Sequence, residues 1–180
     1  MAPLVTEAIV LHAFDYLETS RILRLLTRDA GVLSVLARGA RRSRKRFGSA
    51  MDLFAQGLAE IHVRPNRELQ TLAALDVTRG RSELGEEVGR FTAASLISEI
   101  VLRFPYDESV SGVLEAVDEC LGRIGAADPA HTLDDGLSGA WPILPPLGLT
   151  RSLAPSPPCD APLPPPHALT SFHSPSRPSA

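Results

Sequence analysis

The chain has 180 residues, a formal net charge of -3 and two cysteines, Cys120 and Cys159. This length allows one or two small modules, and a lone pair of cysteines, with nothing else to indicate an oxidising compartment, predicts free thiols and no structural zinc site. The N-terminus lacks the cationic segment of a signal peptide and no apolar stretch is long enough to span a membrane, so we expect a soluble, cytoplasmic protein.

The charge is unevenly distributed along the chain. Residues 1–80 carry twelve Lys and Arg against eight Asp and Glu, whereas residues 81–180 carry six against thirteen. The first part is therefore basic and the remainder is acidic. This asymmetry indicates a polyanionic partner for the first part only.

Five segments in the first 80 residues have the apolar patterns and turn signals of short β-strands. The predicted strands are residues 6–12, 21–27, 32–37, 56–64 and 69–77. Turn residues separate them at positions 29–31 and 65–67, and Gly31 suits a positive φ. The second strand is apolar on both sides, which predicts that it is buried on both. Five short strands and few aromatic residues predict a small closed barrel of the OB type.

After Gly80 the apolar spacing becomes helical. We predict a first helix that ends at Pro105, a second one on which Cys120 is a small buried apolar residue, and a short third one from about Thr132 that includes Leu137 and Trp141. The apolar stripe of the second helix is expected to comprise Val110, Val113, Leu114, Val117, Leu121 and Ile124. The first stripe is expected to comprise Leu84, Val88, Phe91, Leu96 (or Ser95), Ile97, Ile100, Val101 and Phe104. These helices form a module that packs on itself or on the barrel.

The end of the chain is rich in proline. Twelve of the sixteen prolines lie between Pro142 and Pro178, which predicts a disordered or polyproline-like tail. The predicted fold is therefore α+β, with an OB-fold domain at residues 1–80, a helical domain at 81–148 and a tail at 149–180.

A basic run lies between the third and fourth predicted strands. Six of the nine residues from Arg38 to Arg46 are cationic. Such density indicates phosphate neutralisation, because each engaged cation releases condensed counterions, although a solvated linker is the alternative. The candidate DNA-binding residues are Arg38, Arg41, Arg42, Arg44, Lys45, Arg46 and Phe47, with Arg21 and Arg24, and also Arg28, Arg64 and Arg67 if they face the same side.

Phe47 has two interpretations: its ring could stack on an unpaired base, or it could pack against the barrel.

Signals for catalysis are weak in the rest of the sequence. The five histidines are scattered, and the sequence contains neither a phosphate-binding glycine loop nor a nucleophile elbow. We therefore expect no enzyme, no metal and no cofactor.

Several blocks of the sequence resemble the RecO family of DNA repair proteins. The blocks are Ala8–Leu11, Asp15–Leu23, Leu25–Thr27, Gly31–Ser34, Ala37–Arg42, Arg46–Gly48 and Met51–Phe54, with a weaker continuation to Phe104. The resemblance implies an N-terminal OB domain followed by a helical domain. It also implies non-enzymatic binding of single- and double-stranded DNA, strand annealing, and exchange of single-strand binding protein for recombinase together with RecR.

The sequence departs from the family pattern near its end. Some members carry a four-cysteine zinc module, of which only Cys159 has a counterpart here. We expect no zinc and a truncated or frame-shifted C-terminus, which puts the family's contact with single-strand binding protein in doubt. Two other interpretations of the barrel stay open: a protein-interaction adaptor whose basic run only solubilises the chain, and an RNA-binding module.

Overall fold

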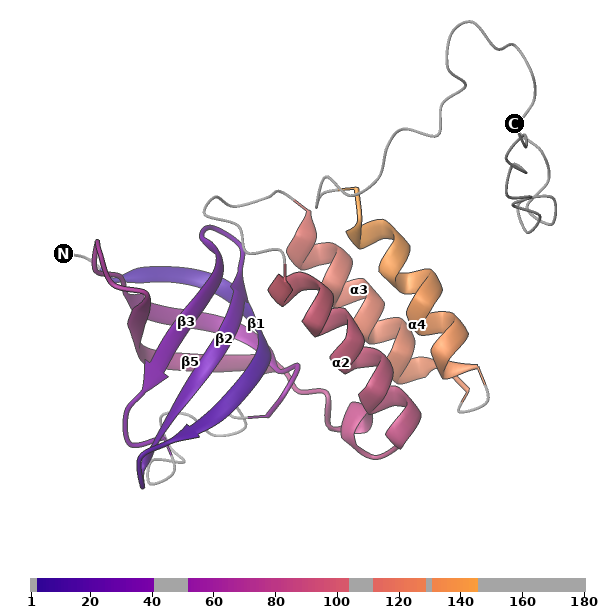
Figure 1. Ribbon diagram of the computed structural model, residues 1–180, viewed down its shortest axis with the longest axis horizontal. Helices are drawn as coiled ribbons and strands as arrows, with labels where there is room; N and C mark the ends of the chain where they lie inside the picture. Colours follow the sequence, from indigo (N-terminus) through magenta and orange to yellow (C-terminus); the bar gives the residue numbers. More distant parts are fainter. Residues whose placement is uncertain (1–2, 41–51, 104–111, 129–130, 146–180) are drawn as a thin grey trace, which may run out of the picture. The chain divides into compact units, whose positions relative to one another are not determined.

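The computed structural model describes residues 3–40, 52–103, 112–128 and 131–145 (Figure 1). Its strands are β1 (Leu4–Tyr16), β2 (Ser20–Thr27), β3 (Gly31–Ala37), β4 (Gln56–His62) and β5 (Leu69–Arg79). All five predicted strands are present, although β1 extends four residues beyond the predicted end. The expected tail at residues 149–180 lies outside the described residues.

The strands form a closed barrel in the order β1-β2-β3-β5-β4, in which β1 pairs with both β2 and β4. The pairing of β3 with β5 is parallel, and the other pairs are antiparallel. This closure confirms the predicted OB-type barrel followed by helices. The predicted positive φ at Gly31 is also confirmed, at 60°.

Strand β2 contributes to two separate apolar clusters. Leu23 and Leu25 point into the barrel, where they pack with Val35 and Ile61. Leu26 points outward and packs against the helices. The prediction that this strand is buried on both sides is confirmed for its C-terminal half, because the helices cover the outer face there.

A β-bulge divides β1 into two parts. Val10 pairs with Leu25 and His12 pairs with Arg24, so Leu11 is one extra residue in β1. Before the bulge Val10 points into the barrel, whereas after it Ala13 does. A bulge changes the alternation of side chains between the two faces. Leu11 and His12 therefore both lie on the outer face.

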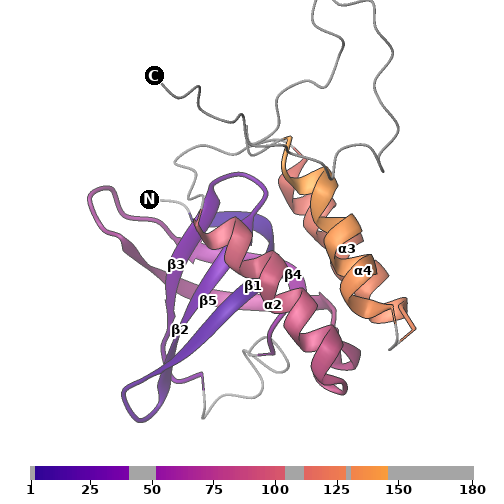
Figure 2. The same ribbon diagram turned by 45° about the vertical axis from the view of Figure 1, so that its right-hand side comes forward.

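The helical part contains η2 (Ser82–Gly85), α2 (Val88–Arg103), α3 (Val113–Ala126), α4 (Thr132–Ala140) and η3 (Trp141–Ile143). The three α-helices lie side by side, with α2 against β1 (Figure 2). Within the described residues, none of the helices is long and apolar enough to cross a membrane.

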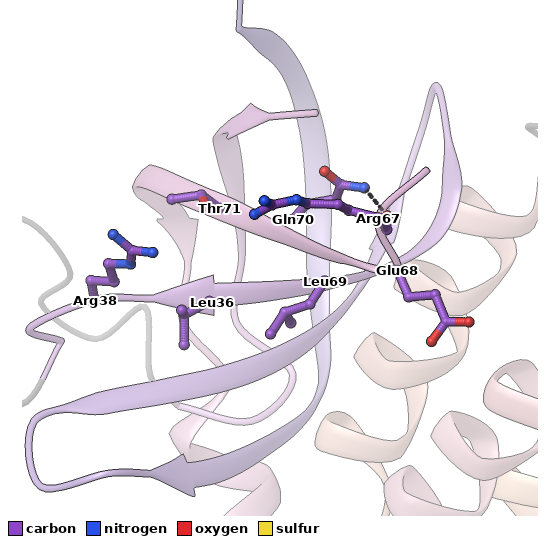
Figure 3. Close-up of a pocket in the computed structure, with 7 residues that line it drawn as sticks. All are labelled: Leu36, Arg38, Arg67, Glu68, Leu69, Gln70 and Thr71. Carbon is purple, nitrogen blue, oxygen red and sulfur yellow. Dashed lines mark hydrogen bonds between the residues drawn. The ribbon is translucent and has the colours of Figure 1, made fainter. Parts of the chain in front are cut away.

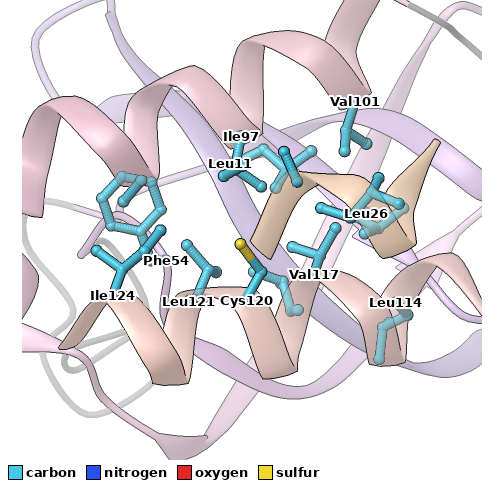
Figure 4. Close-up of a cluster of buried hydrophobic side chains, with 14 of the residues drawn as sticks. Leu11, Leu26, Phe54, Ile97, Val101, Leu114, Val117, Cys120, Leu121 and Ile124 are labelled. Atoms are coloured by element: carbon cyan, nitrogen blue, oxygen red, sulfur yellow. The ribbon is translucent and has the colours of Figure 1, made fainter. Parts of the chain in front are cut away.

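One apolar core joins the barrel to the helices (Figure 4). Ile97 and Leu121 from the helices pack in it with Leu11 and Phe54 from the barrel. Cys120 lies in the same core, where burial raises the pKa of its thiol to about 11. The helical module therefore packs both on itself and on the barrel, and Cys120 is a small buried residue as predicted.

The predicted apolar stripe of the first helix is wrong in part. Ile97 and Val101 are buried, but Val88, Phe91 and Leu96 are exposed. The buried side is formed instead by small residues, Ala93 and Ala94 among them. Small side chains allow a close approach of α4: a Cβ added to Gly136 would lie 2.9 Å from the Ala93 Cβ. The buried side of α2 therefore combines small residues, which allow the close approach of α4, with the apolar Ile97 and Val101.

Arg81 joins the barrel to α3. Its fully buried guanidinium donates to the Phe54 carbonyl, to Gln56 Oε1 at 3.0 Å, and to the Asp118 carboxylate. Burial lowers the pKa of Arg81, whereas Asp118 acts in the opposite direction. The strand-to-helix junction is thus fixed by one arginine with three partners.

Candidate nucleic-acid interface

The outer face of β1, β2 and β3 is covered at one end only. Ile9 of β1 pairs with Leu26 of β2, which pairs with Val32 of β3. All three side chains pack against the helical core. The rows that follow along these strands, toward the end of β3, are at least partly exposed.

We call these rows the open face. It consists of two rows in register across four strands: His12, Arg24, Ser34 and Leu69, then Phe14, Ile22, Leu36 and Thr71. OB-fold proteins commonly bind oligonucleotides on the face formed by the second and third strands and on the adjacent loops. The open face therefore lies where this fold binds its ligands.

A pocket of about 320 Å³ adjoins the open face at β3 and β5 (Figure 3). Leu36, Leu69 and Thr71 belong to both, and Arg38 and Arg67 line the pocket as well. The Arg67 side chain extends toward the side on which Arg38 lies, whereas Glu68 points away from both (Figure 3). Two cations therefore border one concave surface.

Gln70 holds the turn that carries Arg67. Its Oε1 accepts a hydrogen bond from the Arg64 amide at 2.7 Å, and its Nε2 donates to the carbonyls of Arg64, at 3.3 Å, and Arg67. The Gln70 side chain is buried. One side chain thus closes the β4–β5 turn across Asn66, whose φ is 67°.

Replacing Gln70 with Met should loosen this turn. The variant keeps the side-chain volume but removes the hydrogen bonds to Arg64 and Arg67, so we expect a loss of about 1–3 kcal/mol in the free energy of unfolding. Urea denaturation measures the loss. Thr71→Val, next in the strand, is the control and should change stability by less than about 0.5 kcal/mol. Equal stability of the two variants would contradict this role of Gln70.

The arginines of the barrel differ in their partners. Arg38, Arg64 and Arg67 are exposed and have no ion pair among the described residues. Arg21 pairs with Asp15 at 2.8 Å, while Arg24 lies in the open face and its buried Nε has no hydrogen-bond partner in the described part of the chain. The free cations thus gather near the pocket.

Arg28 lies at the helix-covered end instead. It pairs with Glu7 at 2.6 Å and with Glu115 of α3. The hydrogen bond from Arg28 lowers the pKa of Glu7. Arg28 therefore does not extend the positive surface of the open face, because two carboxylates hold it on the side of α3.

The predicted basic run lies largely outside the described residues. Only Arg38 is described; Arg41, Arg42, Arg44, Lys45, Arg46 and Phe47 are not. The sequence nevertheless shows that the run determines the net charge of residues 1–80. Without the run, these residues carry six Lys and Arg against eight Asp and Glu. The basic character of this part comes from the run, which follows Arg38 directly.

Three aromatic side chains of β1 were missed by the sequence analysis. His12, Phe14 and Tyr16 follow the bulge at alternate positions, and all three are exposed, Phe14 at 45% and Tyr16 at 42%. The ring centroids of His12 and Phe14 are 4.3 Å apart. We call these residues the aromatic strip. Their period-two spacing is visible in the sequence, but the predicted strand ended at His12.

The comparisons with known proteins agree with this geometry. Residues 1–81 match the family described as Recombination protein O N terminal. Through this N-terminal domain the chain belongs to the RecO family.

Within the described residues, no group of three His, Cys, Asp or Glu side chains could hold a metal ion.

Curated relatives from the RecO family extend the match beyond the barrel. DNA repair protein RecO of Anaeromyxobacter dehalogenans (strain 2CP-C) is 36% identical over 126 residues, which cover 67% of this chain and 48% of that protein. The protein of that name from Anaeromyxobacter sp. (strain Fw109-5) is 35% identical over 72% of the chain and 50% of its own length. The one from Salinibacter ruber is 31% identical over 77% and 52%.

The chain spans about half the length of these RecO relatives. The RecO N-terminal match contains all five strands and ends at residue 81, the buried arginine that joins the barrel to α3. The open face, the pocket and the aromatic strip therefore all belong to the RecO N-terminal domain.

Proposed function

We propose that this chain is a non-enzymatic DNA-binding protein of recombinational DNA repair. The curated RecO relatives carry the name DNA repair protein. The observation that carries the proposal is the open face, which the helices leave uncovered beside two unpaired arginines, Arg38 and Arg67. The basic run continues directly from Arg38, so phosphates and bases can be bound on one surface.

The cations have a common role in this proposal. Arg38, Arg67 and the run from Arg41 to Arg46 neutralise backbone phosphates, and Arg24 supplies a donor within the open face. Arg21 contributes at the rim, next to Asp15. Residues 1–80 then act as the DNA-binding domain, residues 81–148 as a helical domain, and residues 149–180 as a tail.

The proposed activity includes single- and double-stranded DNA binding, strand annealing and assistance in recombinase loading. Annealing follows from charge: a cationic surface reduces the repulsion between the phosphates of two strands. RecR and single-strand binding protein are the proposed protein partners, as the resemblance of the sequence to the RecO family implies.

The double variant Arg38→Gln/Arg67→Gln tests the binding surface. Fluorescence anisotropy across a salt series should show that the log–log slope for single-stranded DNA falls in magnitude by about 1.4, or about 0.7 for each lost phosphate contact. The control Arg103→Gln/Arg123→Gln changes the net charge equally in α2 and α3 and should leave the slope unchanged.

Equal slopes for both double variants would contradict the proposed surface. Tighter binding of an RNA strand than of the DNA strand of the same sequence would favour an RNA-binding role. Failure of the wild-type chain to bind DNA at low salt would favour a protein adaptor.

A further inference from the structure

We propose that the aromatic strip stacks on unpaired bases and makes the open face selective for single-stranded over duplex DNA. This inference rests on the proposed function and adds to it the residues that recognise bases. The strip consists of His12, Phe14 and Tyr16, which follow the bulge on the outer face of β1.

The exposure of the strip differs from that of the rest of β1. Ile9 and Leu11, on the same face, are almost fully buried by the helices. Phe14 and Tyr16 keep 45% and 42% of their surface exposed. The helices thus stop short of Phe14 and Tyr16, so these two rings face solvent on a face where this fold binds ligands.

The local geometry suits stacking. His12 and Phe14 lie with their ring centroids 4.3 Å apart and their planes inclined by 34°. Each ring limits the rotation of the other, so less side-chain entropy remains to be lost when a base stacks on the pair. Aromatic platforms accept any base, because every base has a π-face.

Charge indicates a nucleic acid and not an apolar peptide. Phe14 is in register with Ile22, Leu36 and, on β5, Thr71, and the last two line the pocket that Arg38 and Arg67 border. Along the open face, three strand spacings of the sheet, roughly 14 Å, lie between β1 and β5. A single strand that crosses this face contacts the cations at one side and the aromatic strip at the other.

The opposite side of the strip has a different character. His12 also lines a groove of about 520 Å³ between β1 and α2, with apolar walls from Leu11, Phe54, Phe91 and Leu96. None of the described residues that line it is a Lys or Arg. The phosphates are therefore held on the side of Arg38, and the bases point toward the strip.

Strand selectivity follows from access to the base faces. In a duplex the bases stack on one another and their faces are closed to the protein. A single strand exposes them, while both forms present phosphates. Removing the rings should thus weaken single-strand binding and leave duplex binding almost unchanged.

The test compares the full chain with Phe14→Ala/Tyr16→Ala on a single strand, its duplex, and an abasic strand of the same length. Anisotropy should show a loss of about ten- to a hundred-fold on the single strand. The loss should be less than about twofold on the duplex and on the abasic strand, because neither offers a base face. The salt slope should stay constant, because no phosphate contact is removed.

Three control variants isolate the rings. Phe14→Tyr/Tyr16→Phe keeps both rings and should bind like the wild type. Phe14→Leu/Tyr16→Leu keeps apolar area without rings and should lose as much as the alanine variant on the single strand. Unchanged duplex binding by both variants excludes a loss through unfolding. Trp141→Ala removes an aromatic residue that is 59% exposed on η3 and should have no effect.

Photocross-linking of a 5-iodouridine strand should label the peptide that contains Phe14 and Tyr16. Undiminished single-strand binding by the alanine variant, while the wild type still binds with a salt-dependent affinity, would overturn the stacking role and leave the proposed function standing. A loss confined to an RNA strand would overturn the assignment to DNA. Absence of salt-dependent binding by the wild type would instead remove the proposed function itself.

Discussion

Neutralising four cations of the basic run should lower the affinity for single-stranded DNA by about three orders of magnitude at about 50 mM salt. The variant is Arg41→Gln/Arg42→Gln/Arg44→Gln/Lys45→Gln. Each engaged cation contributes about 0.7 to the log–log salt slope on a single strand, so the slope should fall by about 2.8. Anisotropy over a salt series measures both quantities.

A charge-matched control makes this result specific. Its four residues are exposed and lie away from the open face: Arg28, Arg79, Arg103 and Arg123. The first three of them pair with carboxylates. Their fourfold replacement by Gln changes the net charge by the same amount. Exposed ion pairs contribute little to stability, so this variant should fold and keep its slope. Equal losses in the two variants would mean that net charge alone, and not the run, governs binding.

Gly57→Ala should destabilise the barrel by at least about 3 kcal/mol, which lowers the melting temperature by about 10 °C. Gly57 lies in β4 beside a bulge of β5, where Gln56 pairs with Arg79 and Gly57 with Val77. A Cβ at this position would lie 2.1 Å from the carbonyl oxygen of Asp76. Backbone atoms cannot rotate away as a side chain can, so β4 and β5 must separate.

Gly80→Ala is the matched control for this variant. The same atom is added, but nothing lies within 4 Å of it. Its stability should stay within about 0.5 kcal/mol of the wild type. Thermal unfolding followed by circular dichroism compares the two, and equal melting temperatures would show that the barrel tolerates a side chain at position 57.

The barrel was predictable because its strands follow local rules. Apolar patterns and turn residues located all five strands, and Gly31 has the expected positive φ. The extension of β1 to Tyr16 was not predictable in the same way. The bulge at Leu11 shifts the alternation by one residue, so His12, Phe14 and Tyr16 continue the even spacing of Ala8 and Val10 in the sequence but lie on the opposite, outer face of β1.

The partners of charged and apolar side chains required the fold. Arg28 looks in the sequence like any other cation of the barrel, but one of its carboxylate partners, Glu115, lies 87 residues later. The exposed Val88 and Phe91 likewise fit a helical stripe by spacing. They lie outside the packed side of α2, where the small Ala93 allows α4 to approach closely, and this contact depends on two helices and not on one.

The bulge in β1 makes one strand serve two independent purposes. Substitutions at Ile9 or Leu11 should change the stability of the fold, whereas those at the exposed Phe14 or Tyr16 should leave the apolar core intact. Selection can therefore alter the second set without risk to the first. A barrel of this kind is suited to acquiring new strand or sequence preferences, and a library confined to the aromatic strip and its neighbours on β2 and β3 would explore them on an intact scaffold.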